Sequence, residues 1–368
     1  MQLRELLFTQ TQITGLFGFE NRKEIFEGVH RSYKFVVFTL EKGGKTQSFP
    51  AAFMRLNAQD LETFPQQGGI DIAVDLVRRL SPDSLSVMEF KDGLDVRIAQ
   101  RITQFPLLGD EINGKWNVQL TREFDMTNDS GLFRTSAGAG RLPLYEGKMI
   151  HQFDHRYAEP RYWVDEKQGR KALSGAANDD GRLDYQLYRI GFRDVARNTD
   201  ERTMIATVLP KMRFAGNTAI VSQSPKDGCE LLAIVGLLNS FTVDYVIRMK
   251  VSAHCNMFYV YQLPIPRLTE TDAAFKPIIE RAARLICTTP EFDDLAKEVG
   301  LGSHKAGATD PAERARLRAE LDGLVAHLYG LTEEEFAHIL ATFPVVEASV
   351  KDAALAAYKA FAPKSGAL

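Results

Sequence analysis

Residues 142–156, Leu142-Pro-Leu-Tyr-Glu-Gly-Lys-Met-Ile-His-Gln-Phe-Asp-His-Arg156, lie at the centre of the region that decides the fold class. From about Trp116 to Val221 the chain has short strand-like runs, such as Gly-Lys-Trp-Asn-Val-Gln-Leu and Ala-Ile-Val-Ser, broken by Gly, Asn, Asp and Pro. This pattern predicts a mixed, loop-rich domain. Residues 165–184 hold little that could be buried, so we expect an exposed insertion there.

The region before this domain shows both strand and helix patterns. Tyr33–Leu40 and Ser48–Leu56 are rich in β-branched and aromatic residues and flank Gly43-Gly44, which predicts a hairpin. Residues 67–82 and 93–104 carry apolar side chains at three- and four-residue spacing, which indicates two amphipathic helices.

The region after the domain is expected to be mainly helical. We predict a buried helix at 229–249, an apolar strand at 258–266 that ends in two prolines, and helices at 271–288, 310–329 and 332–342. Thr332 followed by Glu335 fits a capping box at the start of the last helix. The fold class predicted from these patterns is α+β (mixed α/β).

The charge is distributed unevenly along the chain. The formal net charge of -3 argues against a protein that coats nucleic acid non-specifically. Residues 97–213 nevertheless hold 19 Lys plus Arg against 16 Asp plus Glu, whereas the remainder holds 26 against 32. An anionic partner would therefore bind in the middle of the chain.

Arginines alternate with aromatic residues in this middle region, a combination that suits a DNA surface because Arg binds guanine and phosphate bidentately. These arginines are Arg122, Arg134, Arg141, Arg161, Arg189, Arg193, Arg197 and Arg202. Each could equally be a structural ion-pair partner, Arg189 and Arg193 especially.

His151 and His155 allow three interpretations. On a helix their four-residue spacing would bring both imidazoles and Asp154 to one face as a possible metal site, but no distant ligand is evident. With Lys148 and Arg156 beside them, they instead suggest a polar loop that presents donors to phosphates and base edges. Hydrogen-bonded histidines inside a structural loop are the third possibility.

Two further motifs resemble catalytic signatures. Pro82-Asp83 followed by Glu89-Phe-Lys91 resembles the carboxylate and lysine set of magnesium-dependent nucleases, although the spacing is short. Gly138-Ala-Gly140 resembles a glycine loop for S-adenosylmethionine, but no strand precedes it and Leu142-Pro143 follows where a helix is needed. We expect no catalytic, cofactor-binding or metal-binding residue in this chain.

Several stretches together resemble the C-terminal half of the large single-chain adenine DNA methyltransferases of Type IIG restriction-modification systems and of the BREX and DISARM phage-defence systems. These stretches are Arg122–Ser130, Leu142–Arg156, Arg202–Ala206, Leu237–Tyr245, Tyr261–Pro266 and Leu321–Glu335. The resemblance covers nearly the whole chain, and the stretch 142–156 is its most specific part.

This resemblance implies a division of the chain into three parts. Residues 1–64 would be the end of the methyltransferase-like sheet, 65–266 the target-recognition domain and 267–368 a helical spacer or docking region. DNA contacts are then expected from Arg122, Arg134, Arg141, Lys148, His151, His155, Arg156 and Arg161.

The family's catalytic part has no counterpart here. The chain has no Pro-Pro pair and hence no Asn-Pro-Pro-Tyr loop for a flipped adenine. We therefore expect a double-stranded DNA recognition module that works with a methyltransferase domain or chain holding S-adenosylmethionine. An excised fragment, a split gene or a degenerate remnant would each explain the missing part.

Two other functions remain open beside DNA recognition. The chain could be a protein-interaction subunit that docks on the catalytic chain without binding DNA, or a free-standing nuclease that uses Asp83 and Glu89. Because the N-terminus, Met1-Gln-Leu-Arg-Glu, lacks the pattern of a secretion signal and no apolar run approaches the roughly 20 residues of a membrane span, we expect a cytoplasmic location.

Overall fold

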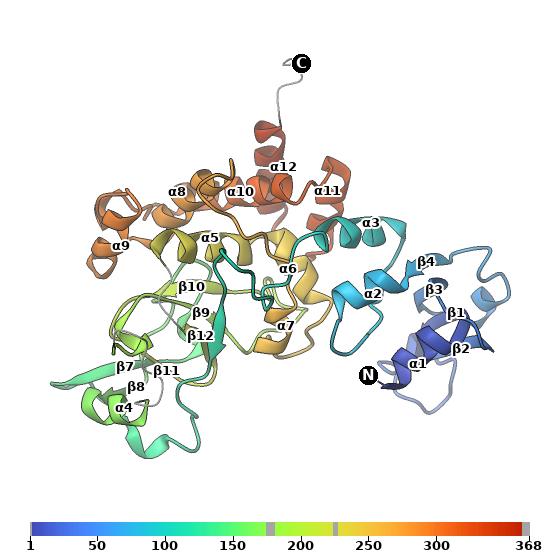
Figure 1. The fold of residues 1–368 in the computed structure, drawn as a ribbon, viewed down its shortest axis with the longest axis horizontal. Coiled ribbons are helices and arrows are strands. Elements are labelled where there is room, and N and C mark those ends of the chain that lie inside the picture. Colours follow the sequence, from blue (N-terminus) through green and yellow to red (C-terminus); the bar gives the residue numbers. More distant parts are fainter. Residues whose placement is uncertain (1, 174–180, 224–226, 363–368) are drawn as a thin grey trace. The chain divides into compact units, whose positions relative to one another are not determined.

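The protein divides into two compact units, Met1–Phe105 and Pro106–Leu368. The structure, a computed structural model, describes residues 2–173, 181–223 and 227–362 (Figure 1). Helices and sheets of several strands occur in both units, so the predicted α+β class is confirmed.

The first unit contains one four-stranded sheet of order β2-β1-β3-β4 together with three helices. Its elements are α1 (Gln2–Gln10), β1 (Thr11–Glu20), β2 (Lys34–Lys42), β3 (Ser48–Arg55), β4 (Ile70–Ala73), α2 (Val74–Leu80) and α3 (Gly93–Ile102). Asp92 caps α3, because its side chain accepts hydrogen bonds from the backbone N–H groups of Leu94 and Asp95.

The predicted hairpin is wrong in its pairing, although both strands exist. β2 pairs antiparallel with β1, and β1 pairs parallel with β3, so that β1 separates the two strands expected to be neighbours. β1 buries side chains such as Ile13 and Phe17 and therefore takes a central position, whereas β2 is exposed along much of its length. Gly43 and Gly44 do turn the chain, with φ of 85° and 83°.

The helix predicted at 67–82 is shorter than expected. Residues Ile70–Ala73 form β4, which pairs antiparallel with β3, and α2 begins only at Val74. The strand pairing buries Ile72 completely. Pairing with a neighbouring strand thus outweighs the local helical spacing. The helix predicted at 93–104 corresponds to α3 and is confirmed.

The second unit contains two four-stranded sheets, of order β10-β9-β12-β5 and β11-β7-β8-β6. The strands are β5 (Gln119–Thr121), β6 (Phe133–Arg134), β7 (Arg141–Tyr145), β8 (Tyr162–Asp165), β9 (Arg189–Arg193), β10 (Ala206–Leu209), β11 (Phe214–Ala215) and β12 (Ala219–Gln223). Their short lengths and the loops between them match the pattern expected for residues 116–221.

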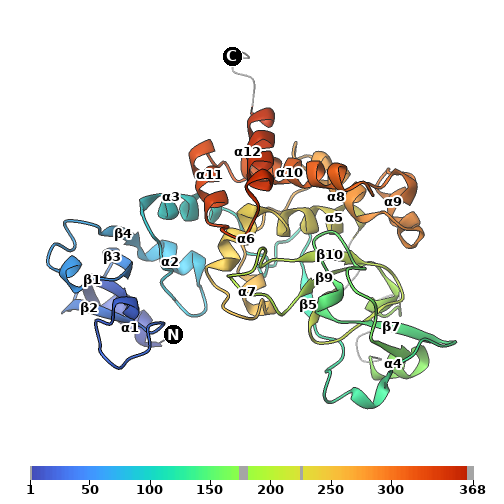
Figure 2. The same cartoon turned by 180° about the vertical axis from the view of Figure 1, so that it is seen from behind.

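The second unit also contains helices, most of them after β12 and one, α4 (Glu166–Ala172), directly after β8. The helices after β12 are α5 (Gly228–Leu238), α6 (Phe241–Arg248), α7 (Met257–Tyr261), α8 (Phe275–Ile286), α9 (Asp293–Glu298), α10 (Pro311–Leu328), α11 (Glu333–Ala341) and α12 (Ala348–Phe361). Figures 1 and 2 show α5, α8 and α10 as a layer beside the β10-β9-β12-β5 sheet, with the β7-β8 sheet and α4 farther from the helices.

Two predicted elements of the second unit differ in the structure. The helix expected at 229–249 is two helices, because the Ser240 side chain accepts from the N–H of Val243 and starts α6 anew. Of the strand expected at 258–266, residues 258–261 belong to α7, whose first turn is capped by Asn256, and Pro264 makes an isolated bridge with Leu107. The capping box of Thr332 and Glu335 at α11 is confirmed.

The insertion expected at 165–184 is exposed over most of α4, as predicted, but is buried at its C-terminal end. Residues Glu166–Ala172 form α4, whose Gly169 packs against Phe214, and Leu183 and Tyr185 are buried. Residues 174–180 lie outside the described part of the chain.

Over the described residues, no single helix is both long and apolar enough to cross a membrane, although α5 and α6, which meet at a 61° bend, reach that length and composition together.

Candidate nucleic-acid interface

The segment between β7 and β8 contains a tight loop, residues 147–157, which we call the 147–157 loop. A 3-10 turn, Gly147–Met149, opens it. His151 and Asp154 then exchange backbone hydrogen bonds of 2.8 and 3.0 Å, and Phe153 between them has a φ of 58°. The two histidines therefore lie on a loop, as favoured from the sequence, and not on one face of a helix.

Arg193 of β9 holds the first half of this loop. Its Nε donates to the carbonyl oxygens of Gly147 at 3.0 Å and Ile150 at 2.6 Å. A hydrogen bond from a charged donor contributes about 1.5–3 kcal/mol. Arg193 is thus a structural residue, one of the two roles left open for it by the sequence.

The second half of the loop is held by Gln152, a buried side chain. Its Nε2 donates to the carbonyl oxygens of Met204 at 3.2 Å and Asn239 at 3.1 Å. The backbone N–H of Phe153 donates to Ala206 of β10 at 3.1 Å. Because both halves are anchored to the core, the loop presents its outward-facing side chains in a fixed arrangement.

His155 faces inward from the loop. Its side chain is buried, with the residue 4% exposed, and Nδ1 lies 2.9 Å from the hydroxyl of Tyr145. Burial lowers the pKa of His155 well below its usual value, so the imidazole is neutral near pH 7. The structure therefore places His155 in the structural role rather than on a surface that a duplex could reach.

His151 and Tyr157 form an aromatic pair at the rim of the loop. Their rings stack with centroids 4.6 Å apart, and the Arg193 guanidinium lies 5.5 Å from the Tyr157 centroid. Burial and nearby Arg193 lower the pKa of His151 to about 4, so it acts as a neutral donor or acceptor. Tyr157 is 60% exposed and presents an apolar ring with a polar tip to solvent.

The exposed charges around this loop are predominantly basic. Between residues 129 and 173, the exposed charged residues are six basic ones against one acidic one, Glu159. The basic residues are Lys148, Arg156, Arg161, Lys167, Arg170 and Lys171. The remaining acidic residues of the segment are half-buried. This surface, which we call the basic lobe, has the charge that phosphates require although the whole chain is acidic.

The other predicted DNA-contact residues are partly engaged by their own neighbours. Arg122 forms an ion pair with one carboxylate oxygen of Asp194 at 2.8 Å. The other oxygen of Asp194 lies 3.0 Å from His254 Nδ1. Arg134 donates to the carbonyl of Gly131, and Arg141 donates to the carbonyl and hydroxyl oxygens of Ser136.

The remaining predicted contacts differ in accessibility. Arg161 is exposed with its guanidinium over Tyr162, whereas Lys148 pairs with Glu146 at 3.1 Å but stays half in solvent. Arg189 is an internal ion-pair partner, since it is buried against Glu123.

The sequence places Tyr157 among the aromatic residues that alternate with the arginines, but it does not indicate the lysines of α4 as members of this surface. Tyr157 follows the predicted contact Arg156 directly, but nothing in its own pattern distinguishes an exposed aromatic from a buried one. Lys167 and Lys171 lie four residues apart on α4, which puts them on one helix face. Both lysines fall in the stretch that the sequence predicts to be an exposed insertion. Their four-residue spacing is the feature that indicates a shared helix face.

Two of the stretches that carry the family resemblance, Arg202–Ala206 and Leu237–Tyr245, meet in a buried cluster. Arg202 Nε donates to Asp244 at 2.6 Å, and its Nη2 donates to the carbonyl oxygen of Asn239 at 2.5 Å. Asp244 also accepts from the backbone N–H groups of Thr203 and Met204. These specific motifs thus join the helices to β10 and support the 147–157 loop, rather than forming an exposed site.

The two catalytic-looking motifs have structural surroundings. Glu89 of the suspected magnesium set forms an ion pair with Lys34 at 2.5 Å, and Asp83 is exposed. After Gly138 and Gly140 the chain continues into β7, so no helix N-terminus follows the glycines as a methyl-donor loop requires. The nuclease hypothesis stays a prediction.

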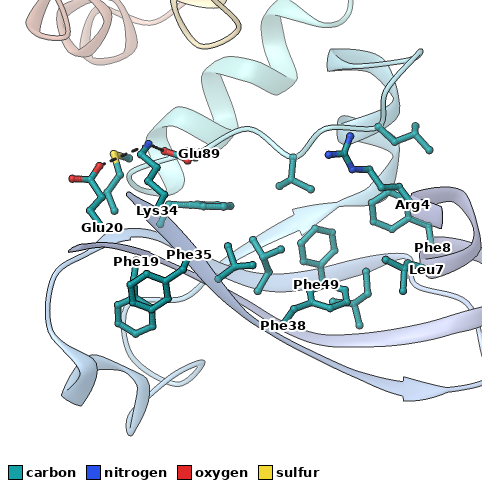
Figure 3. A pocket seen from close by; sticks show the side chains of 18 residues that line it. Arg4, Leu7, Phe8, Phe19, Glu20, Lys34, Phe35, Phe38, Phe49 and Glu89 are labelled. Atoms are coloured by element: carbon teal, nitrogen blue, oxygen red, sulfur yellow. Dashed lines mark hydrogen bonds and ion pairs between the residues drawn. The ribbon is translucent and has the colours of Figure 1, made fainter. Parts of the chain in front are cut away.

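The first unit has an apolar groove on its sheet, with a volume of about 360 Å³. Figure 3 shows its aromatic lining, which includes Phe8, Phe38 and Phe49. Arg4 lies toward one end, and Lys34 at the other end pairs with Glu89 and lies 3.8 Å from Glu20. The groove is suited to apolar surface rather than to phosphate.

Comparisons with known proteins give only distant similarity. No family model and none of the curated proteins matches the chain. One similar solved structure is the Type IIL restriction-modification enzyme MmeI in complex with DNA, with a TM-score of 0.45 and 13% identity over 93% of this chain and 47% of that one. The type IIG restriction endonuclease BpuSI gives a TM-score of 0.37 and 14% identity over 89% and 45%.

A third similar structure is the HsdS subunit from Thermoanaerobacter tengcongensis, with a TM-score of 0.23 and 12% identity over 64% of this chain and 50% of that one. The chain spans about half the length of each of these proteins. TM-scores below 0.5 leave the function to be derived from the residues themselves.

Proposed function

We propose that the chain is the sequence-specific double-stranded DNA recognition module of an adenine-N6 DNA methyltransferase in a cytoplasmic restriction-modification or phage-defence system. The observation that carries the proposal is the basic lobe, whose exposed charged residues are six basic against one acidic on a chain of formal net charge -3. A basic surface confined to one lobe suits a local grip on phosphates rather than a general coating of nucleic acid.

The roles of individual side chains follow from their exposure. Lys148 and Arg156 on the 147–157 loop and Lys167 on α4 would bind backbone phosphates and fix the register of the module on the duplex. Tyr157 and the neutral His151 would approach base edges, because one offers a ring with a hydroxyl and the other an uncharged donor or acceptor. The anchored loop favours specificity, since little conformational entropy is lost on binding.

The chemistry would come from a methyltransferase domain or chain that partners this module. Bound there, S-adenosylmethionine would supply the methyl group for the exocyclic nitrogen of an adenine turned out of the duplex. The residues of this chain would select the site and hold the DNA while that transfer takes place.

The proposal is tested by DNA binding over a range of salt concentrations. For the full chain, log K should fall linearly with log salt, by about 0.9 for each phosphate contact. Changing Lys148→Ala and Arg156→Ala together should lower this slope by about 1.8, the contribution of two phosphate contacts. The control is Lys276→Ala with Lys305→Ala, which removes the same charge from exposed positions outside the basic lobe.

Selection from a randomised duplex pool then tests specificity. An enriched motif that is retained with the control variant but lost with Tyr157→Ala would support a sequence-recognising loop. Equal loss with the control pair would show that only net charge matters, and salt-independent or absent binding by the unchanged chain would refute the proposal.

A protein-interaction subunit is the second candidate, and the apolar groove of the first unit favours it. Several large apolar side chains are exposed close to its lining residues in sequence, among them Leu3, Leu6 and Val36. Exposed apolar surface of this kind marks interaction sites. Binding of the chain to a methyltransferase partner should then be nearly insensitive to salt and weakened by Val36→Glu, with DNA binding absent.

A further inference from the structure

A second cavity lies behind the 147–157 loop, wholly inside the second unit. Its volume is about 290 Å³. It is bounded by the loop, by the junction of α5 and α6, by α10 and by the beginning of α12. The cavity therefore touches both the proposed DNA-binding loop and the C-terminal helices.

Most polar groups in the wall of this cavity are already satisfied. Arg202 is paired with Asp244, and Asp322 accepts the backbone N–H of Phe241 at 2.8 Å. These groups belong to the buried framework. They leave little capacity to bind an additional ligand.

Arg318 of α10 is different. Its half-buried guanidinium lines the cavity, and within the described residues it forms no hydrogen bond or ion pair. His151 and the hydroxyl-bearing Ser349 line the same space. A guanidinium that is partly removed from water with its donors unused has both the charge and the fork geometry to bind an oxyanion.

Several guanidinium groups act on His151, which lines this cavity. Arg318, Arg202 and Arg193 all act to lower the pKa of His151, and only Asp154 opposes them among its largest influences. Arg202 is already paired with Asp244, so Arg318 is the guanidinium that an anion in this cavity would meet. Buried Asp322 and exposed Glu201 also line the cavity, and both act to raise the pKa of Arg318, so an anion has to compete with these two carboxylates.

We propose that this cavity binds a phosphate group of a nucleotide, held by Arg318 with His151 and Ser349 as further hydrogen-bonding partners. The apolar wall, which includes Phe241 and Val350, suits the sugar or base attached to that phosphate. The volume of about 290 Å³ lies just below the range for small-ligand sites, about 300–1,000 Å³, so a single nucleotide fits better than a larger ligand. The nucleotide is either free or part of a DNA strand.

Two arms of one experiment distinguish these sources. In the first arm, thermal unfolding of the full chain is followed with inorganic phosphate or deoxyadenosine monophosphate against chloride at constant ionic strength. In the second arm, the salt dependence of duplex binding is measured. The second arm rests on the proposed DNA-recognition function, whereas the first does not.

Arg318→Gln is compared with Arg316→Gln, a change on the same helix at an exposed arginine that does not line the cavity. Ser349→Phe, at an exposed position on the cavity wall, fills the space while keeping Arg318. A free-nucleotide site predicts stabilisation by phosphate or the nucleotide that Arg318→Gln and Ser349→Phe abolish and Arg316→Gln retains. A DNA-phosphate site predicts no such stabilisation. It predicts instead that Arg318→Gln lowers the salt slope of duplex binding by about 0.9, whereas Arg316→Gln leaves this slope unchanged.

Equal behaviour of Arg318→Gln and Arg316→Gln in both arms would overturn the phosphate site. If the unchanged chain binds no DNA, the proposed DNA-recognition function is refuted, but the phosphate site is not. The first arm then tests by itself whether the cavity binds phosphate. Stabilisation that persists in both Arg318→Gln and Ser349→Phe would place the phosphate elsewhere and would also refute the inference.

Discussion

Asp244 carries an unusual share of the hydrogen bonds that join the sheet to the helices. Its side chain is fully buried and accepts from the Arg202 side chain and from the N–H groups of Thr203 and Met204. Removing one partner of a buried ion pair leaves an uncompensated charge, which costs about 3–5 kcal/mol. Asp244→Ala should lower the free energy of unfolding by that amount in urea titrations.

The control for Asp244 is Asp294, whose pair with Lys211 is largely exposed. Exposed ion pairs contribute about 0–1 kcal/mol, so Asp294→Ala should change stability little. Equal effects of the two substitutions would mean that Asp244 does not stabilise the buried cluster. A partial effect of Asp244→Asn is expected, because the amide keeps the shape and loses the charge.

Asp322 makes stability depend on pH in the acid range. Burial raises its pKa to about 6, against about 3.9 in an unfolded chain. The folded state therefore binds more protons between these values, and stability from this group is fully present below about pH 4 and is lost as pH rises through 6. Two units correspond to about 3 kcal/mol.

Comparison with Asp322→Asn isolates this effect, because Asn can still accept the N–H of Phe241 and cannot titrate. The unfolding free energy of the unchanged chain, minus that of the variant, should fall by up to about 3 kcal/mol between pH 4 and pH 7. A difference that stays constant over this range would show that the carboxyl group titrates normally in the folded chain.

At the scale of elements, local signals were sufficient for the C-terminal helices and insufficient for the first sheet. The capping box of Thr332 and Glu335 acts within four residues, so α11 starts where the sequence predicts. The order of β1, β2 and β3 depends instead on which strand buries both faces. The strand order is therefore set by packing across the whole unit, and a local sequence pattern carries no information about that packing.

The candidate site divides in the same way. The sequence indicated the basic 147–157 loop, and the structure exposes Lys148 and Arg156 there. It could not distinguish His155 from His151, because their different burial is produced by contacts with residues far from the loop in sequence, such as Phe292 packed on His155. The sequence likewise could not show whether Arg189 contacts DNA or forms a structural ion pair, because its partner Glu123 lies 66 positions away.

Asn239 links the turn between α5 and α6 to β10. Its side chain accepts from the N–H of Ala206 at 3.0 Å and donates to the same residue's carbonyl oxygen at 2.9 Å. Asn239→Ala would leave the buried N–H unsatisfied, which costs about 1–3 kcal/mol. Denaturant unfolding should show this loss, whereas Asn198→Ala at an exposed position should be neutral. Unchanged stability of Asn239→Ala would mean that β10 does not require this link.

Helix α4 should contribute to DNA affinity through its exposed basic side chains, Lys167, Arg170 and Lys171. Lys167 and Lys171 are exposed on one face, and the short helix is packed against the sheet through the buried Gly169. Changing both lysines to Gln should lower the salt slope of duplex binding by up to about 1.8 without changing the motif selected from a DNA pool. A changed motif would instead assign α4 to base recognition, and an unchanged slope would remove it from the interface.

At the scale of the whole molecule, the two units differ in what they offer to DNA. Residues 1–105 hold 13 Lys plus Arg and 13 Asp plus Glu, and their groove is apolar. The basic lobe lies entirely in residues 106–368, which have buried clusters of their own around Tyr145 and Phe124. We therefore expect residues 106–368, produced alone, to fold and to bind duplex DNA with the salt slope of the full chain.

The matching experiment compares three proteins, the full chain and the fragments 1–105 and 106–368, by fluorescence anisotropy with one duplex at several salt concentrations. Circular dichroism first establishes that each fragment is folded, so that a loss of binding is not a loss of structure. Because counterion release depends only on the phosphate contacts made, equal slopes for the full chain and 106–368 would confine those contacts to the second unit. A folded 106–368 fragment with a clearly smaller slope would show that the first unit, despite its neutral charge, supplies phosphate contacts of its own.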